Sequence, residues 1–247
     1  MAVLKKISIV LSGLIILISA EISIGGPPFL TDDPEPVDLK HWEFYISSIN
    51  IFQQGDQSGT APHIEMNYGI IRDVQVHVLL PLNYNHISGR NITFGYAYSE
   101  IGLKYRFMKE TANRPQIGTF PIIEIPTIKN NEFGNGKTQV FLPIWIQKSW
   151  NKITTYGGAG YWINPGTGNR NWVFAGWELQ YDFSEKVTLG GELYYHSSDA
   201  IGSLSATAFN LGGSINLTKK FHIIFSAGHS LLNKSFTSAY FGLLWTI

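Results

Sequence analysis

The chain ends in the stretch AYFGLLWTI, residues 239–247, in which apolar side chains recur at every second position. The apolar stripe consists of Ala239, Phe241, Leu243, Trp245 and Ile247. The residues between them are small or polar, with Leu244 as the exception. Since successive side chains of a strand point to opposite faces, this segment predicts a strand with one wholly apolar face. A closed β-barrel that spans a membrane is the simplest structure in which every strand needs such a face.

The same alternation recurs through most of the chain and predicts about twelve strands. The expected strands are residues 41–52, 60–70, 74–84, 94–107, 115–126, 137–149, 153–163, 171–183, 187–197, 204–217, 221–230 and 236–247. An even number of strands of this length suits a membrane barrel, whose tilted strands need about 9–11 residues to cross the hydrocarbon.

Periodicity alone does not say which face is inside, because a soluble β-sandwich also alternates. Three features favour the membrane: the strands are long, they follow one another as hairpins without a helix, and aromatic residues stand near the ends of the apolar face. Trp42, Tyr105, Phe183 and Trp245 are among these aromatic residues. The predicted fold class is therefore all-β, a closed antiparallel up-and-down transmembrane barrel over residues 41–247.

The composition excludes several classes of function. The 18 basic residues balance the 18 acidic ones, so no net charge draws the chain to nucleic acid. The absence of cysteine excludes disulfides, thiolate metal sites, a cysteine nucleophile and a lipoprotein anchor. The glycine-rich pieces at 157–160 and 166–168 are not followed by a helix that could hold a phosphate, so we expect no cofactor.

Residues 1–20 have the pattern of a secretory signal peptide. Lys5 and Lys6 precede an apolar stretch at residues 7–18, and Ser19-Ala20 supplies small residues at a cleavage site. An uncleaved anchor helix is the alternative, although the apolar stretch is short for a bilayer span. An exported chain with amphipathic strands points to the outer membrane of a Gram-negative-type cell.

Residues 21–40 differ from the rest of the chain, because four prolines and an acidic run exclude a central strand or helix interior. We expect an extended N-terminal segment ahead of the barrel. Its carboxylates Asp32 and Asp33 are expected to dock it at or into the periplasmic mouth.

The connections support a consistent orientation. Tight polar turns, such as 72–73 and 151–152, alternate with longer loops, such as 85–93 and 164–170. With an even number of strands both termini lie on the side of the tight turns, which is periplasmic in outer-membrane barrels.

If the apolar face meets lipid, the opposite face lines a lumen that collects charged side chains. The expected lumen-lining residues are Glu43, Glu65, Glu100, Lys104, Arg106, Glu124, Glu178 and Glu192. Carboxylates with a few cations are typical of a polar channel wall. A barrel of twelve strands falls between filled eight-stranded barrels and open sixteen-stranded ones, so an open and a filled lumen remain alternatives.

One constellation suggests an enzyme. His196, Ser198 and Asn210 have a spacing that resembles the His-x-Ser and downstream Asn of outer-membrane phospholipase A, also a twelve-stranded barrel. A serine nucleophile with a histidine base is the logic of acyl transfer. The predicted register places His196 and Asn210 in the lumen, whereas the catalytic groups of that family face lipid, so we expect no enzyme.

Several short motifs resemble a family of outer-membrane transporters labelled "MetA-pathway of phenol degradation". They are PFLTDDP at 28–34, WEF at 42–44, EIGLKYRF at 100–107, LGGEL at 189–193 and FSAG at 225–228. The resemblance implies an outer-membrane barrel that acts as a channel for small, hydrophobic or aromatic compounds. Two positions depart from the pattern: His229 stands where arginine is common, and Ile247 where barrels usually end in Phe or Trp.

Together these patterns predict a passive channel or transporter in the cell outer membrane. Its expected partners are membrane lipid, a small-molecule solute and the outer-membrane barrel assembly machinery. A lipid hydrolase built on His196 and Ser198, and a filled barrel with a structural or surface-interaction role, are the alternatives.

Overall fold

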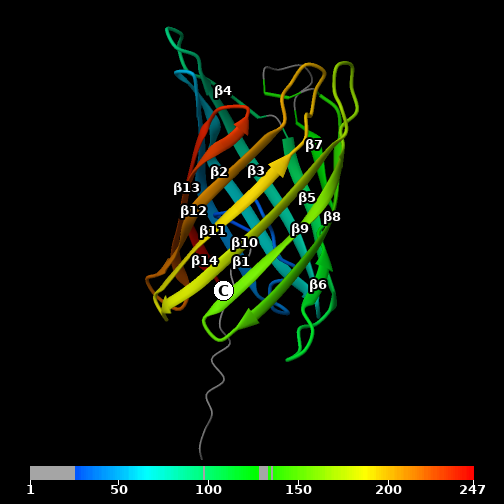
Figure 1. Cartoon of the computed structure of the whole chain (residues 1–247), viewed down its shortest axis with the longest axis vertical. Helices are drawn as coiled ribbons and strands as arrows, with labels where there is room; N and C mark the ends of the chain where they lie inside the picture. The colour runs from blue at the N-terminus through cyan, green and yellow to red at the C-terminus, as the bar shows by residue number, and fades with distance from the viewer. Residues whose placement is uncertain (1–25, 97, 128–132, 135) are drawn as a thin grey trace, which may run out of the picture.

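The computed structural model describes residues 26–96, 98–127, 133–134 and 136–247, and these residues form one antiparallel sheet that closes on itself (Figure 1). Its strands are β1 (Trp42–Gln53), β2 (Asp56–Ile71), β3 (Val74–His86), β4 (Thr93–Gly95), β5 (Tyr98–Met108), β6 (Gln116–Thr119), β7 (Ile122–Pro126), β8 (Gln139–Trp150), β9 (Ile153–Ile163), β10 (Trp172–Ser184), β11 (Val187–His196), β12 (Ala206–Asn216), β13 (Phe221–Asn233) and β14 (Thr237–Thr246). None of the described residues forms a helix long and apolar enough to span a membrane. The predicted signal peptide, residues 1–20, lies outside the described residues.

The predicted twelve-stranded barrel is confirmed, although two of its strands are broken. β4 and β5 both pair with β3, and β6 and β7 both pair with β5 and β8, so each couple is one strand of the wall. The predictions of unbroken strands at 94–107 and 115–126 are therefore wrong. In the second case Pro121, which has no N–H to give a ladder, lies in the gap.

The barrel closes between its first and last strands. β1 pairs with β14 over ten residues and with β2 on its other edge. Just beyond β14, Ile247 exchanges two backbone hydrogen bonds with Trp42, at 2.8 and 2.9 Å. The C-terminal stretch with which the chain ends is thus the closing strand, which pairs the last strand of the barrel with the first.

The outer surface is apolar and the inner face is not, as the two-residue period requires. On β14, Phe241 is 57% exposed on the outside, whereas Leu244 is fully buried on the inside. The outer face of the other strands carries residues of the same kind, including Leu103, Leu142, Trp177 and Leu211. Such a belt of exposed aliphatic and aromatic side chains suits a surface in contact with lipid.

The two ends of the barrel differ. The end with the connections 72–73, 151–152 and 185–186, here named the turn end, also holds the C-terminus. The opposite end, here named the loop end, carries the longer loops and the tips of the β1–β2 and β3–β4 hairpins. The segment 53–59, which lies between the strands predicted at 41–52 and 60–70, is instead mostly strand, because β1 and β2 continue to a turn at Gln54 and Gly55, both at positive φ.

Candidate functional site in the barrel lumen

The eight charged residues predicted to line the lumen all lie on the inner face. Glu65, Lys104, Glu178 and Glu192 are buried. The others, Glu43, Glu100, Arg106 and Glu124, are partly buried and belong to the same face as their strand neighbours. The structure thus brings these side chains around one interior, in groups that lie at different levels along the barrel axis.

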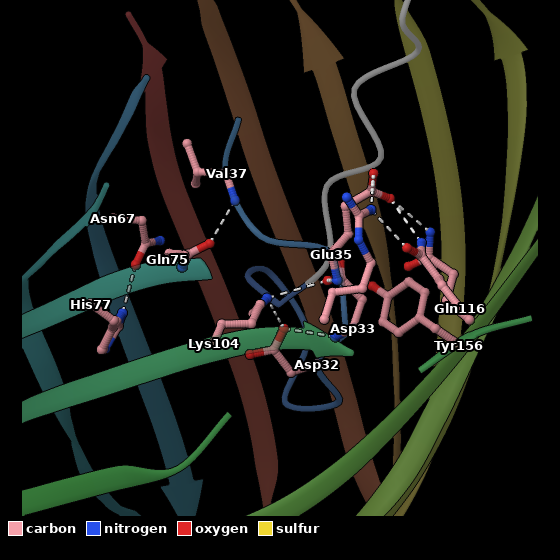
Figure 2. Close-up of polar contacts among 12 residues, drawn as sticks. Asp32, Asp33, Glu35, Val37, Asn67, Gln75, His77, Lys104, Gln116 and Tyr156 are labelled. Carbon is pink, nitrogen blue, oxygen red and sulfur yellow. Dashed lines mark hydrogen bonds and ion pairs between the residues drawn. The ribbon is translucent and has the colours of Figure 1, made fainter. Parts of the chain in front are cut away.

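Residues 26–40, here named the plug, occupy the turn-end half of this interior (Figure 2). Backbone N–H groups of Leu30 and Thr31 donate to the Glu192 carboxylate at 2.9 and 2.8 Å. Two strands along the wall, Ser226 of β13 donates to the carbonyl of Pro28 at 2.7 Å. Proline-rich backbone cannot pair with a sheet as a strand does, so wall side chains satisfy its polar groups instead.

The centre of the plug is held by an ion triad. Lys104 Nζ lies 2.8 Å from Asp32 Oδ1 and 3.2 Å from Asp33 Oδ1. Asp33 is only 1% exposed. Burial raises the pKa of Asp33 from 3.8 to about 7, against the opposing effect of Lys104, and the neighbouring carboxylates of Asp32 and Glu35 raise it further. Asp32 and Asp33, the two carboxylates that the sequence analysis singled out in this segment, both contact Lys104 of the wall.

A second polar group fixes the plug closer to the turn end. Arg106 donates to Glu35 at 3.2 Å and to Asp73, in the β2–β3 turn, at 2.7 Å. Glu35 also accepts from the amides of Gln116 and Gln147, at 2.9 and 3.2 Å. One plug carboxylate therefore joins three wall strands, β5, β6 and β8.

The plug leaves the lumen beside β2 and β3. The N–H of Val37 donates to Gln75 Oε1 at 2.8 Å, and that of Lys40 donates to the carbonyl of Gly69 at 2.7 Å. Gly69 has to be glycine, because a Cβ there would lie 2.0 Å from the carbonyl oxygen of Asp38. The chain then enters β1 at the barrel rim.

The plug does not fill the turn-end half completely. A cavity of about 370 Å³ remains between it and the wall from β5 to β12. Charged side chains described above, Glu35 and Arg106, line part of this cavity. Most of the remaining lining consists of amide and hydroxyl side chains: Gln116, Gln147, Gln180, Ser149, Thr154 and Thr188. This half is therefore polar and hydrated in character.

A layer of carboxylates crosses the middle of the lumen. Glu192 accepts from Asn210 at 2.6 Å, and Glu178 accepts from Gln180 at 2.8 Å. Across the barrel Glu65 and Glu100 flank the ring of His77, at 3.5 and 3.7 Å. Because buried charges are stable only with partners, these contacts explain how so many carboxylates share one interior.

The loop-end half is unlike the rest, because aromatic side chains replace the polar ones. Here the aromatic cluster means Phe120, Phe141, Trp145, Trp162, Trp172, Phe174, Tyr194 and Phe236. Phe141, Trp162 and Trp172 stack in a row, with ring centroids 4.8 and 5.2 Å apart. The rings of Phe174 and Tyr194 stack below them at 6.1 Å.

Sequence reasoning missed this cluster. It assigned the aromatic residues to the lipid face, and that is correct for most of them, such as Trp177 and Tyr181. The available signal was the parity of the strands: Trp172 and Phe174 share parity with Glu178 and Gln180, so they belong to the inner face. The polar lumen face becomes aromatic towards the loop end.

The alternative hydrolase site is not assembled. Ser198 donates to the carbonyl of Ala200 at 2.6 Å, and His196 contacts the carbonyl of Ser197 at 3.2 Å. Asn210 bonds Glu192 and Ser238 in the middle of the lumen. Among the described residues no hydrogen bond joins His196, Ser198 and Asn210. Their spacing in the sequence therefore does not correspond to an assembled catalytic triad.

The comparisons with known proteins agree with this architecture. No protein-family model matches the sequence, and no curated protein matches it. Among solved structures, the COG4313 outer membrane channel from Pseudomonas putida F1 is similar, with a TM-score of 0.68 and 15% identity over 87% of this chain and 98% of that one. The KdgM porin has a TM-score of 0.56 and 12% identity, over 81% of this chain and 98% of that one. The NanC porin has a TM-score of 0.56 and 8% identity, over 82% and 98%. The chain therefore has the fold of outer-membrane channel and porin barrels.

Proposed function

We propose that the protein is a passive outer-membrane channel for small aromatic or otherwise apolar compounds. The observation that carries this proposal is the aromatic cluster inside a barrel whose outer face is already suited to lipid. A barrel needs apolar side chains outside in order to reside in a membrane, but a row of stacked rings inside serves contact with a solute. The similar folds named above belong to channels and porins, and the sequence motifs resemble a family labelled for phenol degradation.

The aromatic cluster offers a solute ring surfaces for stacking and one N–H group for a hydrogen bond. Trp162 and Trp172 are partly exposed, so their rings can stack with a planar solute. Trp145 is 1% exposed, and its Nε1 has no hydrogen-bond partner among the described residues. Since a buried indole N–H usually has a partner, an aromatic solute with a hydroxyl or carbonyl oxygen would satisfy it.

The plug supplies control of passage. It is held by ion pairs and hydrogen bonds to side chains, and backbone pairing with a strand is limited to one bridge, Leu39 with Gly69. Such contacts are exchanged for water more easily than a sheet ladder. We infer that the turn end is periplasmic and that the plug moves there to open the lumen, whose charged residues then tune what passes.

The experiment is conductance of the purified full-length chain in planar bilayers, paired with uptake of a phenolic solute into proteoliposomes. We expect small conductance for the full chain, larger conductance after deletion of residues 21–40, and uptake that saturates with the solute. Unchanged conductance after the deletion contradicts the plug as a gate.

A filled barrel with a structural role is the second candidate, because plug and cluster together occupy much of the interior. The same experiment separates the two. Zero conductance and no solute uptake by both chains, with the heat-modifiable migration of a folded barrel, would establish the filled barrel and reject the channel.

A further inference from the structure

The aromatic cluster does not extend around the whole loop-end half of the lumen. Among the described residues, strands β2, β3 and β4 contribute none of its members. On this side a cavity of about 430 Å³ lies against the hairpins that project at the loop end (Figure 1). Its volume falls within the range of small-molecule sites, about 300–1,000 Å³. The cavity is here named the amide pocket, and the residues that line it include Ile49, Ser58, Thr60, Asn83, Asn85 and Phe133.

The pairing of the strands turns the polar side chains of the amide pocket inward. Ile51 faces the lumen, because it packs against the aromatic cluster, and Ser58 is its partner across the β1–β2 ladder. On the next ladder Asn85 is opposite Ser58. Asn83 is opposite Thr60 in the same way. Since facing residues of a ladder share one side of the sheet, all these side chains lie on the inner face.

Polar side chains on the two faces of these strands differ in their hydrogen bonds. On the outer face Tyr84 donates to Asn50 Oδ1 at 2.5 Å, and Gln57 donates to the Tyr84 hydroxyl at 2.9 Å. On the inner face Asn83 Oδ1 is buried and has no hydrogen-bond partner among the described residues. A buried polar atom without a partner is costly. No bond to the wall holds this amide, so it can turn towards a group that enters the amide pocket.

The lining of the amide pocket favours a neutral ligand that carries hydroxyl groups. None of its described lining residues is charged, so nothing there balances a carboxylate, a phosphate or an ammonium group. Amides and hydroxyls both donate and accept hydrogen bonds, as the hydroxyl groups of a sugar do.

An aromatic ring lies beside these polar groups. Gly95 of β4 pairs with Asn83, and a Cβ on Gly95 would lie 2.7 Å from Cδ2 of Phe133. The ring of Phe133 therefore packs directly against this part of the wall. An apolar ring next to amide groups suits a sugar, which has C–H groups on the faces of its ring and hydroxyl groups around its edge.

The amide pocket and the aromatic cluster are neighbours along β1. Ile49 lines the amide pocket, and Ile51, two residues further on the same face, packs against the aromatic cluster. Alternate residues of a strand lie about 7 Å apart, so one small molecule can touch both sites. A ligand made of an aromatic ring and a sugar matches the polarity of the two sites together.

We propose that the amide pocket binds the sugar of an aromatic glycoside while the aromatic cluster holds its aromatic ring. This inference rests on the proposed channel function and deepens it, because it names the class of aromatic compound that the loop end prefers. An aromatic compound without a sugar occupies the aromatic cluster alone and gains nothing from the amide pocket.

The test is isothermal titration calorimetry of the purified full-length barrel, in a detergent without a sugar head group. The two probes are 4-nitrophenyl β-glucoside and 4-nitroanisole, which carries a methyl group in place of the sugar. The variant Asn83→Leu replaces the amide with an apolar side chain of similar size. The matched control is Asn91→Leu, the same change at an exposed position in the loop that follows β3.

We expect the wild type to bind the glucoside about fivefold more tightly than 4-nitroanisole, since one added hydrogen bond is worth about that factor. Asn83→Leu should bind both probes with the affinity of 4-nitroanisole, and Asn91→Leu should behave as the wild type. Equal binding of the two probes by the wild type, or a preference that survives in Asn83→Leu, overturns the role of the amide pocket while leaving the channel intact. If the wild type binds neither probe, the aromatic lumen site of the proposed function fails as well.

A second variant keeps the inference testable if Asn83→Leu does not fold. Asn85 lines the same cavity and lies two residues further along β3, next to the end of the strand. Asn85→Leu should lose the preference for the glucoside and keep the affinity for 4-nitroanisole. A preference retained by an Asn85→Leu barrel with the heat-modifiable migration of a folded protein would contradict the proposal.

Discussion

The two halves of the lumen are built from different chemistry on the same strands. In the turn-end half, inner positions of β8 and β10 carry Gln147 and Gln180, and a cavity lies beside a plug held by ions. In the loop-end half, inner positions of the same two strands carry Phe141 and Phe174, packed into the aromatic cluster. The difference teaches that strand alternation determines which residues face inward, whereas position along the strand determines what the interior can bind.

The ion triad is the strongest single difference between the halves, so its removal should have the largest effect. Lys104→Met would leave Asp32 and Asp33 buried without a cation, at a cost of about 3–5 kcal/mol. We expect the plug to leave the lumen, seen as a large rise in single-channel conductance. Lys109→Met is the control: its ammonium is exposed and pairs with Asp73, so about 0–1 kcal/mol is expected. Equal conductance of the two variants would contradict the role of Lys104.

The halves should also respond differently to pH. The pKa of Asp33 is raised from 3.8 to about 7 when the plug is docked, so the docked plug binds this proton more tightly than the free plug does. Docking is therefore favoured at low pH and weakens as the pH rises from about 4 to about 7, by about 2 kcal/mol between pH 5 and 7, and it changes little above pH 7. The charges and hydroxyl around Asp33 that set this response are Lys104, Asp32, Glu35, Glu178 and Tyr156.

The measurement is planar-bilayer conductance between pH 5 and 8.5, which we expect to increase with pH. Asp33→Asn should remove the dependence, whereas Asp56→Asn, at the tip of a loop-end hairpin, should retain it. A falling conductance, or a dependence that survives in D33N, would show that another group titrates.

The aromatic half is tested through the solute. Trp162→Ala and Trp172→Ala each remove a stacking surface, and a ring contact is worth about 0.5–1.5 kcal/mol, or up to about tenfold in affinity. We expect phenolic-solute uptake to need a correspondingly higher concentration, with unchanged ion conductance. Trp150→Ala is the control, since Trp150 lies exposed on the lipid face of β8 at the turn end. Uptake that depends on Trp150 as much as on Trp162 would argue against a lumen site.

The smallest predicted effect is a difference in opening frequency between variants of two serines on β13. Ser226 bonds the plug at Pro28, whereas Ser230 bonds the backbone N–H of Phe236 in the loop-end half. Ser226→Ala should therefore cost the docked plug about 1 kcal/mol and raise the frequency of opening events slightly. Ser230→Ala should leave opening unchanged; the reverse pattern would contradict the division of the lumen.

The barrel was predictable because each strand carries its own two-residue period. Even the exceptional Leu244 is explained, since it is an inner residue buried against Tyr45 and Ile224. The break at Pro121 had a signal in the sequence, because proline inside a strand argues against a continuous ladder.

The plug contacts and the aromatic cluster could not be predicted in the same way. The bond from Thr31 to Glu192 spans 161 residues, and no local pattern records which wall position a distant segment meets. The parity of β10 could have placed Trp172 on the inner face, but only the packing of four neighbouring strands shows that inner rings meet one another.

The plug is far in sequence from the wall residues that it contacts. This distance also influences the order in which the parts of the protein assemble. The plug touches Ser226, 198 residues beyond Pro28, and the closing ladder joins the first strand to the last. Contacts across such long stretches of chain form late, because their loop-closure entropy is recovered only when the intervening strands are in place. A half-assembled barrel is therefore a sheet whose central ion triad is not yet made, and the N-terminal segment, although synthesised first, is among the last to reach its native position.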